Sequence, residues 1–212
     1  MPADAAAANA LAGAGAETFE LDVHLPGDDG PAVVTHFRPL GPPAAGLFRD
    51  GWRLRRAGSS LSLGPTLSQA LALLPTGCEA LLDIKGPIRD AEAAARALVA
   101  GVDQPQRTSI CGNAGPVAAA ARRAGIRVWR SVGSPAELDA ALQSVGPAPW
   151  AVTVRHTMLT PAVLAALRRR VPRVLAWTVN SVDRALVLAA WGVDGVTTDR
   201  AQVMTALRAA SR

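Results

Sequence analysis

Residues 78–101, CEALLDIKGPIRDAEAAARALVAG, decide the fold because they place a buried strand directly before a helix. The run CEALLDIK is apolar along most of its length, as expected for a strand that is covered on both faces. The run RDAEAAARALVAG predicts the helix that follows it. A strand followed by a helix is the unit from which parallel sheets are built.

The same unit recurs along the chain. Short alternating units imply parallel strands joined by right-handed crossovers. With the strand-like run at 17–25, the sequence holds seven units, whereas a closed barrel of this type needs eight. The predicted fold class is therefore an α/β fold, a TIM (β/α) barrel that lacks its first strand. The other strand-like runs are 107–112, 126–133, 151–156, 173–180 and 195–199, and the helix-like runs after them are 114–125, 134–145, 160–170, 181–192 and 200–210.

The remaining segments fit one domain over residues 1–212. The stretch 1–16 suits a helix, and PAVVTH at 31–36 suits a hairpin-like return from the first strand. Residues 38–64 are rich in Gly, Pro and Arg, which predicts an irregular loop or a reduced insertion. Thr66 and Ser134 are the expected N-caps of the helices that follow them.

Composition narrows the class of protein. The chain has 22 basic and 17 acidic residues, and only one of the basic residues is lysine. The basic run at 168–170 has no aromatic residues among it and is interpreted as a solvated helix end, which argues against nucleic-acid binding. No run of about 18 apolar residues predicts a membrane span. Cys78 and Cys111 lie in apolar runs and are interpreted as buried thiols, which indicates a reducing, cytoplasmic location.

Acidic residues stand on one face of two predicted strands. Glu20, Asp22 and His24 alternate with apolar residues, and Asp83 and Lys85 are again two residues apart. Carboxylates on a half-buried face raise the free energy of the fold unless a positive charge lies between them. Since reactive groups of such barrels collect at the carboxyl ends of strands, we expect Glu20, Asp22 and Asp83 to bind one hard cation, Mg²⁺ or Ca²⁺.

Two further residues suit chemistry on a phosphate. Lys85, the only lysine of the chain, offers a point charge to a phosphate oxygen. His36 can transfer a proton near neutral pH. A metal ion, an ammonium group and an acid/base residue together favour hydrolysis of a phosphate ester. His24 is a possible further member of this site and His156 is interpreted as structural, while packing is the interpretation for Trp52, Trp129, Trp150 and Trp191.

At this point the sequence resembles the glycerophosphodiester phosphodiesterase family. The matching stretches are 17–37, GPTLSQAL, LLDIK and VLAWTVNSVDRALVLAAWGVDGVTTD, in the family's order. The resemblance implies a barrel of the phosphatidylinositol-phosphodiesterase-like type that hydrolyses glycerophosphodiesters to an alcohol and glycerol 3-phosphate with a divalent cation, in lipid metabolism. Glu20 and Asp22 match two metal carboxylates of that family, and Asp83 matches the third, where the family usually has Glu.

The resemblance also implies roles in binding and catalysis. Lys85 matches a phosphate-contacting lysine, His36 the second catalytic histidine, and Trp177 an aromatic wall beside the glycerol. The family's His-Arg-Gly and Pro-Glu-Asn-Thr motifs are not among these 212 residues. The true start then lies upstream, or the chain is a degenerate relative with an open barrel edge that invites another chain. We therefore expect little turnover, and the alternative function is a non-catalytic relative that binds a phosphate ligand.

Overall fold

The computed structural model describes residues 5–26, 30–35, 54–57, 60–112, 114–143 and 149–211. The chain divides into two compact units. Unit 1 consists of Met1–Asn9 and Glu17–Arg127, and unit 2 of Ala10–Ala16 and Val128–Arg212. Helix α1 (Ala5–Ala14) lies in the stretch predicted to be helical and contributes residues to both units.

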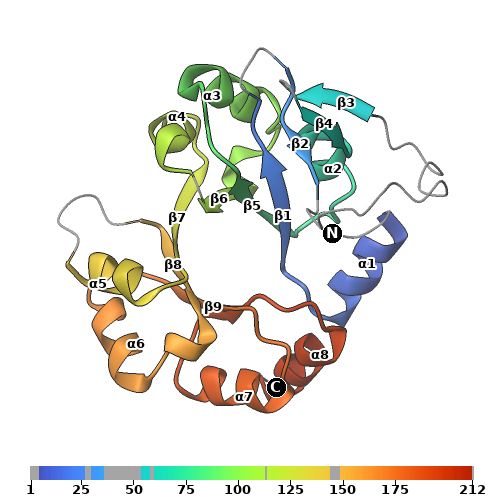
Figure 1. Ribbon diagram of the computed structural model, residues 1–212. Coiled ribbons are helices and arrows are strands. Elements are labelled where there is room, and N and C mark those ends of the chain that lie inside the picture. Colours follow the sequence, from blue (N-terminus) through green and yellow to red (C-terminus); the bar gives the residue numbers. More distant parts are fainter. Residues whose placement is uncertain are drawn as a thin grey trace. The chain divides into compact units, whose positions relative to one another are not determined.

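Unit 1 is built on a sheet with the strand order β6-β5-β1-β2. Strands β1, β5 and β6 are parallel, and β2 is antiparallel to β1 as the predicted hairpin-like return requires. Helices α3 and α4 lie beside β5 and β6 (Figure 1). The elements of this unit are β1 (Thr18–His24), β2 (Val33–Val34), β3 (Leu54–Ala57), β4 (Ser60–Leu63), α2 (Leu67–Leu71), β5 (Glu79–Lys85), α3 (Ala91–Ala100), η1 (Pro105–Arg107), β6 (Thr108–Gly112), η2 (Gly115–Val117) and α4 (Ala118–Arg123).

Part of the segment 38–64 differs from its prediction. Strands β3 and β4 pair antiparallel there, from Leu54 opposite Leu63 to Ala57 opposite Ser60, where the sequence predicts irregular structure. Runs of four residues are too short for their alternation to predict a strand, and the cross-strand ladder supplies the regularity. Residues 36–53, which include His36 and Trp52, lie outside the described residues.

Alternation along β1 separates its two faces as predicted. The odd-numbered residues from Phe19 to Val23 are buried, whereas Glu20 is exposed and Asp22 and His24 are half-buried. In β5, Leu82 and Ile84 are buried, and Asp83 and Lys85 are half-buried. Because side chains of a strand alternate between faces, the polar residues of both strands share one side of the sheet.

Unit 2 repeats the parallel arrangement with the strand order β10-β9-β8-β7. Each pair of neighbouring strands in this order is parallel. Its elements are β7 (Arg127–Val132), which begins at the last residue of unit 1, α5 (Pro135–Gln143), β8 (Ala151–Arg155), η3 (His156–Met158), α6 (Pro161–Arg168), β9 (Val174–Trp177), α7 (Val182–Ala190), β10 (Gly195–Val196) and α8 (Ala201–Ala210).

The core of unit 2 lies on one face of its sheet. Val152 and Val154 of β8 and Val174 and Ala176 of β9 are buried in one cluster with apolar residues of α5 to α8, such as Leu188. Burial of this apolar area is the main favourable term for folding the unit. The alternate residues of β8 and β9 therefore face the other side of the sheet, and Arg155 and Trp177 are among them.

Helix ends follow the sequence predictions. Thr66 caps α2, since its hydroxyl accepts from the Gln69 N–H at 3.3 Å and the Gln69 side chain accepts from the Thr66 N–H at 3.0 Å. Ser134 accepts from the Glu137 N–H at 3.3 Å at the start of α5. Such caps satisfy N–H groups that have no partner within the helix.

All seven parallel strands predicted from the alternation are present, namely β1 and β5 to β10. Cys78 and Cys111 are buried thiols, as predicted. Trp129 is buried, but Trp150 is 39% exposed and so does not fit its interpretation as a packing residue. Among the described residues, every helix is too short or too polar to cross a bilayer.

Candidate functional site

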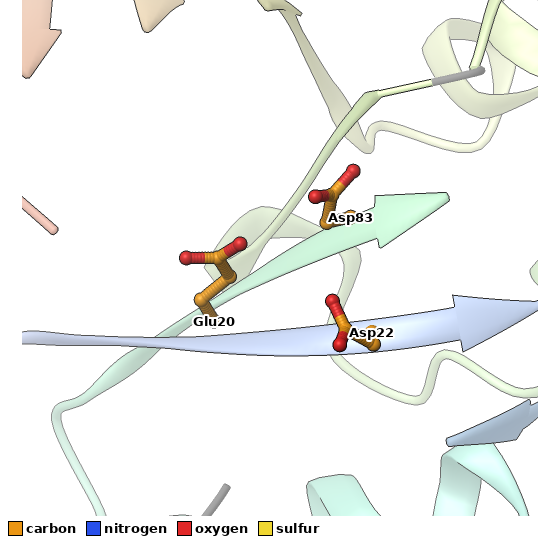
Figure 2. Close-up of side chains that lie close together, drawn as sticks. All are labelled: Glu20, Asp22 and Asp83. Carbon is orange, nitrogen blue, oxygen red and sulfur yellow. The ribbon is translucent and has the colours of Figure 1, made fainter. Parts of the chain in front are cut away.

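The acidic residues predicted to converge lie together in unit 1. Strands β1 and β5 pair in parallel so that Asp22 stands directly opposite Asp83, and Glu20 lies two residues earlier on β1. Each of the three residues offers a carboxylate oxygen, and these oxygens all lie within 4.8 Å of one another. Figure 2 shows the three side chains close together on the two neighbouring strands. Local strand register, rather than a long-range loop, therefore assembles this acidic cluster.

Lys85 stands beside the acidic cluster. Its Nζ lies 3.1 Å from Oδ1 of Asp22, and it also donates a hydrogen bond to Oδ2 of Asp83. Burial alone would lower the pKa of Lys85, but its hydrogen bonds to Asp83 and Asp22 outweigh burial and raise the pKa above its usual range. Lys85 is therefore a permanent positive charge at neutral pH.

His24 lies on the same sheet face and is paired in register with Lys85. Burial lowers its pKa, the Asp22 carboxylate opposes that effect, and the Lys85 charge adds to it. The imidazole is thus predominantly neutral at pH 7, because its pKa lies below the usual value for histidine. This placement agrees with the prediction that His24 shares a face with the carboxylates.

Gly112, at the end of β6, shapes the other side of Asp83. A Cβ at this residue would collide with Oδ1 of Asp83 and would lie 2.7 Å from the Ile84 carbonyl oxygen. Its φ of +69° is in the left-handed region, which favours glycine. The backbone of β6 can therefore approach Asp83 more closely than any residue with a side chain would permit.

The donor set of the acidic cluster fits a hard divalent cation. Carboxylate oxygens are the ligands that Mg²⁺ and Ca²⁺ prefer. Three carboxylates against one ammonium leave a formal excess of two negative charges among these four side chains, which a divalent cation would balance. Glu20, Asp22 and Asp83 are the residues that would hold it.

Unit 2 carries a different group of residues at its strand ends. Arg155 and Trp177 are the last residues of β8 and β9 and are paired in register. The Arg155 guanidinium lies over the Trp177 ring, 5.4 Å from its centre. Nearby, the Gly133 N–H donates to the Glu137 carboxylate at 2.7 Å. This hydrogen bond is the principal reason that the pKa of Glu137 lies below its usual value.

Two other polar residues predicted at strand ends bond to each other. The Asn180 side-chain amide donates to Asp199 Oδ2 at 3.0 Å, and the Asp199 N–H donates back to Asn180 Oδ1 at 2.9 Å. Thr198 adds a hydroxyl donor to the same Asn180 oxygen. These contacts tie the segment after β9 to the segment after β10, which is a structural role.

The structure thus brings together Glu20, Asp22, Asp83 and Lys85. Trp177 belongs to unit 2, and His36 lies outside the described residues. Sequence reasoning missed Arg155 and Gly112. Arg155 could have been found, because it is the last residue but one of the predicted strand 151–156, and the next predicted strand, 173–180, contains Trp177. Nothing in the sequence signals the close approach of Gly112 to Asp83.

Comparison with a family model supports the sequence resemblance over part of the chain. Residues 117–203 match the model of the glycerophosphoryl diester phosphodiesterase family. Arg155 and Trp177 fall within these residues, whereas the acidic cluster lies outside them. No curated protein matches the sequence.

Solved structures extend the likeness over nearly the whole chain. A phosphodiesterase of Oleispira antarctica, solved in complex with the product sn-glycerol-3-phosphate, shares 19% identity with a TM-score of 0.68, over 97% of this chain and 90% of that one. A glycerophosphodiester phosphodiesterase of Thermotoga maritima shares 20% identity with a TM-score of 0.65, over 99% and 91%. One from Parabacteroides distasonis shares 21% identity with a TM-score of 0.64, over 96% and 88%. The predicted fold class, an α/β fold of the TIM-barrel type, is confirmed.

Proposed function

We propose that the chain acts on glycerophosphodiesters, hydrolysing them to an alcohol and glycerol 3-phosphate with a divalent cation, because residues 117–203 match the model of the glycerophosphoryl diester phosphodiesterase family. The observation that carries this proposal is the gathering of three carboxylates from two strands, two of which are paired with one lysine. A cation site with an adjacent ammonium group suits a phosphate ester, because both positive charges stabilise negative charge on phosphate oxygens.

Each residue has a role in the proposal. Glu20, Asp22 and Asp83 would hold Mg²⁺ or Ca²⁺, which when bound supplies positive charge to the phosphate. Lys85 contacts a phosphate oxygen through its ammonium group, and Trp177 forms an apolar wall beside the glycerol.

Hydrolysis breaks the bond from phosphorus to the alcohol oxygen. The attacking hydroxyl, of water or of the glycerol itself, loses a proton, and the leaving alcohol oxygen gains one. His36 is proposed to carry one of these protons. Where the glycerol hydroxyl attacks, a cyclic phosphate forms first, and water then opens it to glycerol 3-phosphate.

The sequence also supports a substrate class and a cellular location. The substrate is a small molecule of lipid metabolism rather than a nucleic acid. A cytoplasmic location fits the two buried thiols, Cys78 and Cys111. The proposal also includes a single domain over residues 1–212. It further includes association of the chain into an oligomer.

A second candidate is a non-catalytic protein that binds a phosphate ligand. The observation that favours it is the makeup of the acidic cluster and Lys85, which are groups that can bind a metal ion and a phosphate without transferring a proton. Binding needs only the carboxylates and Lys85, whereas turnover needs proton transfer at two oxygens.

One experiment separates the two candidates. The purified chain is incubated with glycerophosphocholine and Mg²⁺ or Ca²⁺, and release of glycerol 3-phosphate is measured beside EDTA and a D83N variant. We expect slow release that needs the metal and the Asp83 carboxylate. Metal-dependent binding of glycerol 3-phosphate without any release would favour the non-catalytic candidate. Neither binding nor release would overturn both candidates, and rapid release would show that low turnover was the wrong expectation.

A further inference from the structure

The carboxyl ends of β8 and β9 carry a cationic and an aromatic side chain in contact. Arg155 and Trp177 are register partners at the last position of these parallel strands. The guanidinium carbon lies 5.4 Å from the centre of the indole ring, within the range of a cation–π interaction. A cation–π contact does not satisfy the five N–H donors of the guanidinium as a hydrogen-bond acceptor would.

The Arg155 guanidinium has no hydrogen bond or ion pair to any residue that the structure describes, and Arg155 is exposed. The Glu137 carboxylate interacts electrostatically with Arg155. That carboxylate already accepts hydrogen bonds from the Gly133 N–H at 2.7 Å and the Ser134 hydroxyl at 3.1 Å. Glu137 is thereby held at the start of α5, so it leaves the N–H donors of Arg155 for another acceptor.

The Trp177 ring is held in place from the side of β7. A Cβ built at Gly133 would lie 3.4 Å from two ring carbons of Trp177, so the glycine backbone packs closely against the indole. The Trp177 Nε1 is buried and has no hydrogen-bond partner among the described residues. Buried indole N–H groups usually have a partner. The pair therefore combines a fixed ring, a guanidinium and a second donor that lacks an acceptor.

Two other Arg–Trp pairs in unit 2 show what is particular to this one. Arg184 lies 4.8 Å from the Trp191 ring centre. Its guanidinium also donates hydrogen bonds to the carbonyls of His156 and Leu159, so its role is structural. Arg173 lies 5.4 Å from the Trp150 ring centre, and both residues precede the first residues of β9 and β8. Ligands of parallel α/β folds bind at the carboxyl ends of strands, which is where only Arg155 and Trp177 lie among these three pairs.

We propose that Arg155, which lies over the Trp177 ring, binds an oxyanion at the carboxyl ends of β8 and β9. The ligand class is a phosphate or carboxylate group, because the guanidinium fork matches two oxygens of either group. The inference rests on the proposed function in one respect, since Trp177 is proposed there to contact the substrate. The anion then belongs either to the phosphate of a glycerophosphodiester or to an acidic head group.

Calorimetric binding of sn-glycerol 3-phosphate tests the proposal without any need for turnover. We expect R155Q to weaken binding about tenfold, in line with the loss of a charge-assisted hydrogen bond. R155K should restore part of the affinity, because it keeps the charge without the fork. The matched control is R173Q, which removes an Arg–Trp contact of the same length before the first residues of β9 and β8 and should change affinity less than twofold. Equal affinities of R155Q and the unaltered chain, or equal losses in R155Q and R173Q, would overturn the proposal.

The source of the anion is separated with two diesters. Glycerophosphocholine carries one phosphate and a cationic head group, and glycerophosphoserine adds a carboxylate. Equal weakening of both by R155Q assigns Arg155 to the phosphate, and weakening of glycerophosphoserine alone assigns it to the head group. Weakening of neither overturns the proposal.

Failure of the proposed function has a different signature. The D83N variant disrupts the acidic cluster and leaves Arg155 intact. If the chain releases no glycerol 3-phosphate and binds no metal, but R155Q still loses affinity for sn-glycerol 3-phosphate, the proposed function fails and the anion site stands. Thermal melts of R155Q and R173Q are compared so that a loss of folding is not mistaken for a loss of binding.

Discussion

The two units present opposite charges on strands of the same kind. In unit 1, parallel strands β1 and β5 place Asp22 beside Asp83, with Glu20 close by. In unit 2, parallel strands β8 and β9 place Arg155 beside Trp177. Strand register therefore sets which side chains meet, and the residue at each position sets which charge they present.

The two arrangements also differ in what stabilises them. Like charges close together are unfavourable unless a positive charge lies among them, so the carboxylates of unit 1 need Lys85 and, in the proposal, a metal ion. Arg155 needs no such partner, because it is exposed to water and rests on the electron-rich face of an indole. The acidic cluster should therefore be more sensitive to substitution than the Arg–Trp pair.

Substitution of Asp83 by Asn should have the largest effect. D83N removes one of three proposed metal ligands and one hydrogen-bond acceptor of Lys85. We expect affinity for Mg²⁺ or Ca²⁺ to fall about a hundredfold or more. Substitution of residues that only hydrogen-bond to metal ligands already lowers metal affinity about 10–100-fold. Calorimetric titration of the chain with each metal measures this.

The control for D83N is D139N, an equivalent change at an exposed aspartate of α5. It should leave metal affinity unchanged within about twofold, because it removes an exposed surface charge and none of the three carboxylates of the acidic cluster. If D83N and D139N bind metal equally well, Asp83 is not a metal ligand, and the proposed difference between the two units is wrong.

Much of the fold could be predicted because its signals are local. Each parallel strand is an apolar run such as Ala151–Arg155, and helix starts such as Thr66 carry their own capping residues. The hairpin of β3 and β4 could not be predicted, since its strands have four residues each and depend on pairing with each other.

The acidic cluster was predictable for a related reason. Glu20, Asp22 and Asp83 lie on strands in which polar and apolar residues alternate. This alternation fixes the face on which they stand before any tertiary contact is known. The interpretation of Trp150 as a packing residue was wrong because its exposed ring lies beneath Arg173, a partner more than twenty positions away. Such contacts depend on strand register, which a single sequence does not reveal.

Gly112 provides a second test of the acidic cluster in unit 1, because its backbone lies against Asp83. G112A would place a methyl group against Oδ1 of Asp83 and force a non-glycine residue into the left-handed region. We expect a loss of roughly 1–3 kcal/mol in the free energy of unfolding, and a loss of metal affinity of about tenfold as Asp83 shifts. Urea denaturation and metal titration measure the two effects.

G77A is the matched control for the backbone part of that effect. Gly77 also has a positive φ, +92°, but a Cβ there would meet nothing within 4 Å. It should cost about 1 kcal/mol through strain alone and leave metal affinity unchanged. Equal metal affinity in G112A and G77A would mean that the approach of Gly112 does not position Asp83.

The smallest expected effect is that of Glu137, at the start of α5 in unit 2. Its carboxylate accepts from the Gly133 N–H and the Ser134 hydroxyl, and these bonds hold its pKa below the ordinary value of 4.5. With a depressed pKa in the folded state, the unfolded chain binds more protons at acidic pH. The stabilisation is therefore fully present above pH 4.5 and is lost as the pH falls through the folded pKa.

E137Q keeps an acceptor for the cap but removes the charge, so we expect a loss of a few tenths of a kcal/mol at pH 7. Denaturation at pH 7 and at successively lower pH should show the unaltered chain and E137Q converging below pH 4.5. The control is E92Q, which removes an exposed carboxylate from the first turn of α3 and breaks its pair with Arg96. Because Gly133 packs against Trp177, a change in sn-glycerol 3-phosphate affinity in E137Q but not in E92Q would show that this cap also positions the Arg–Trp pair.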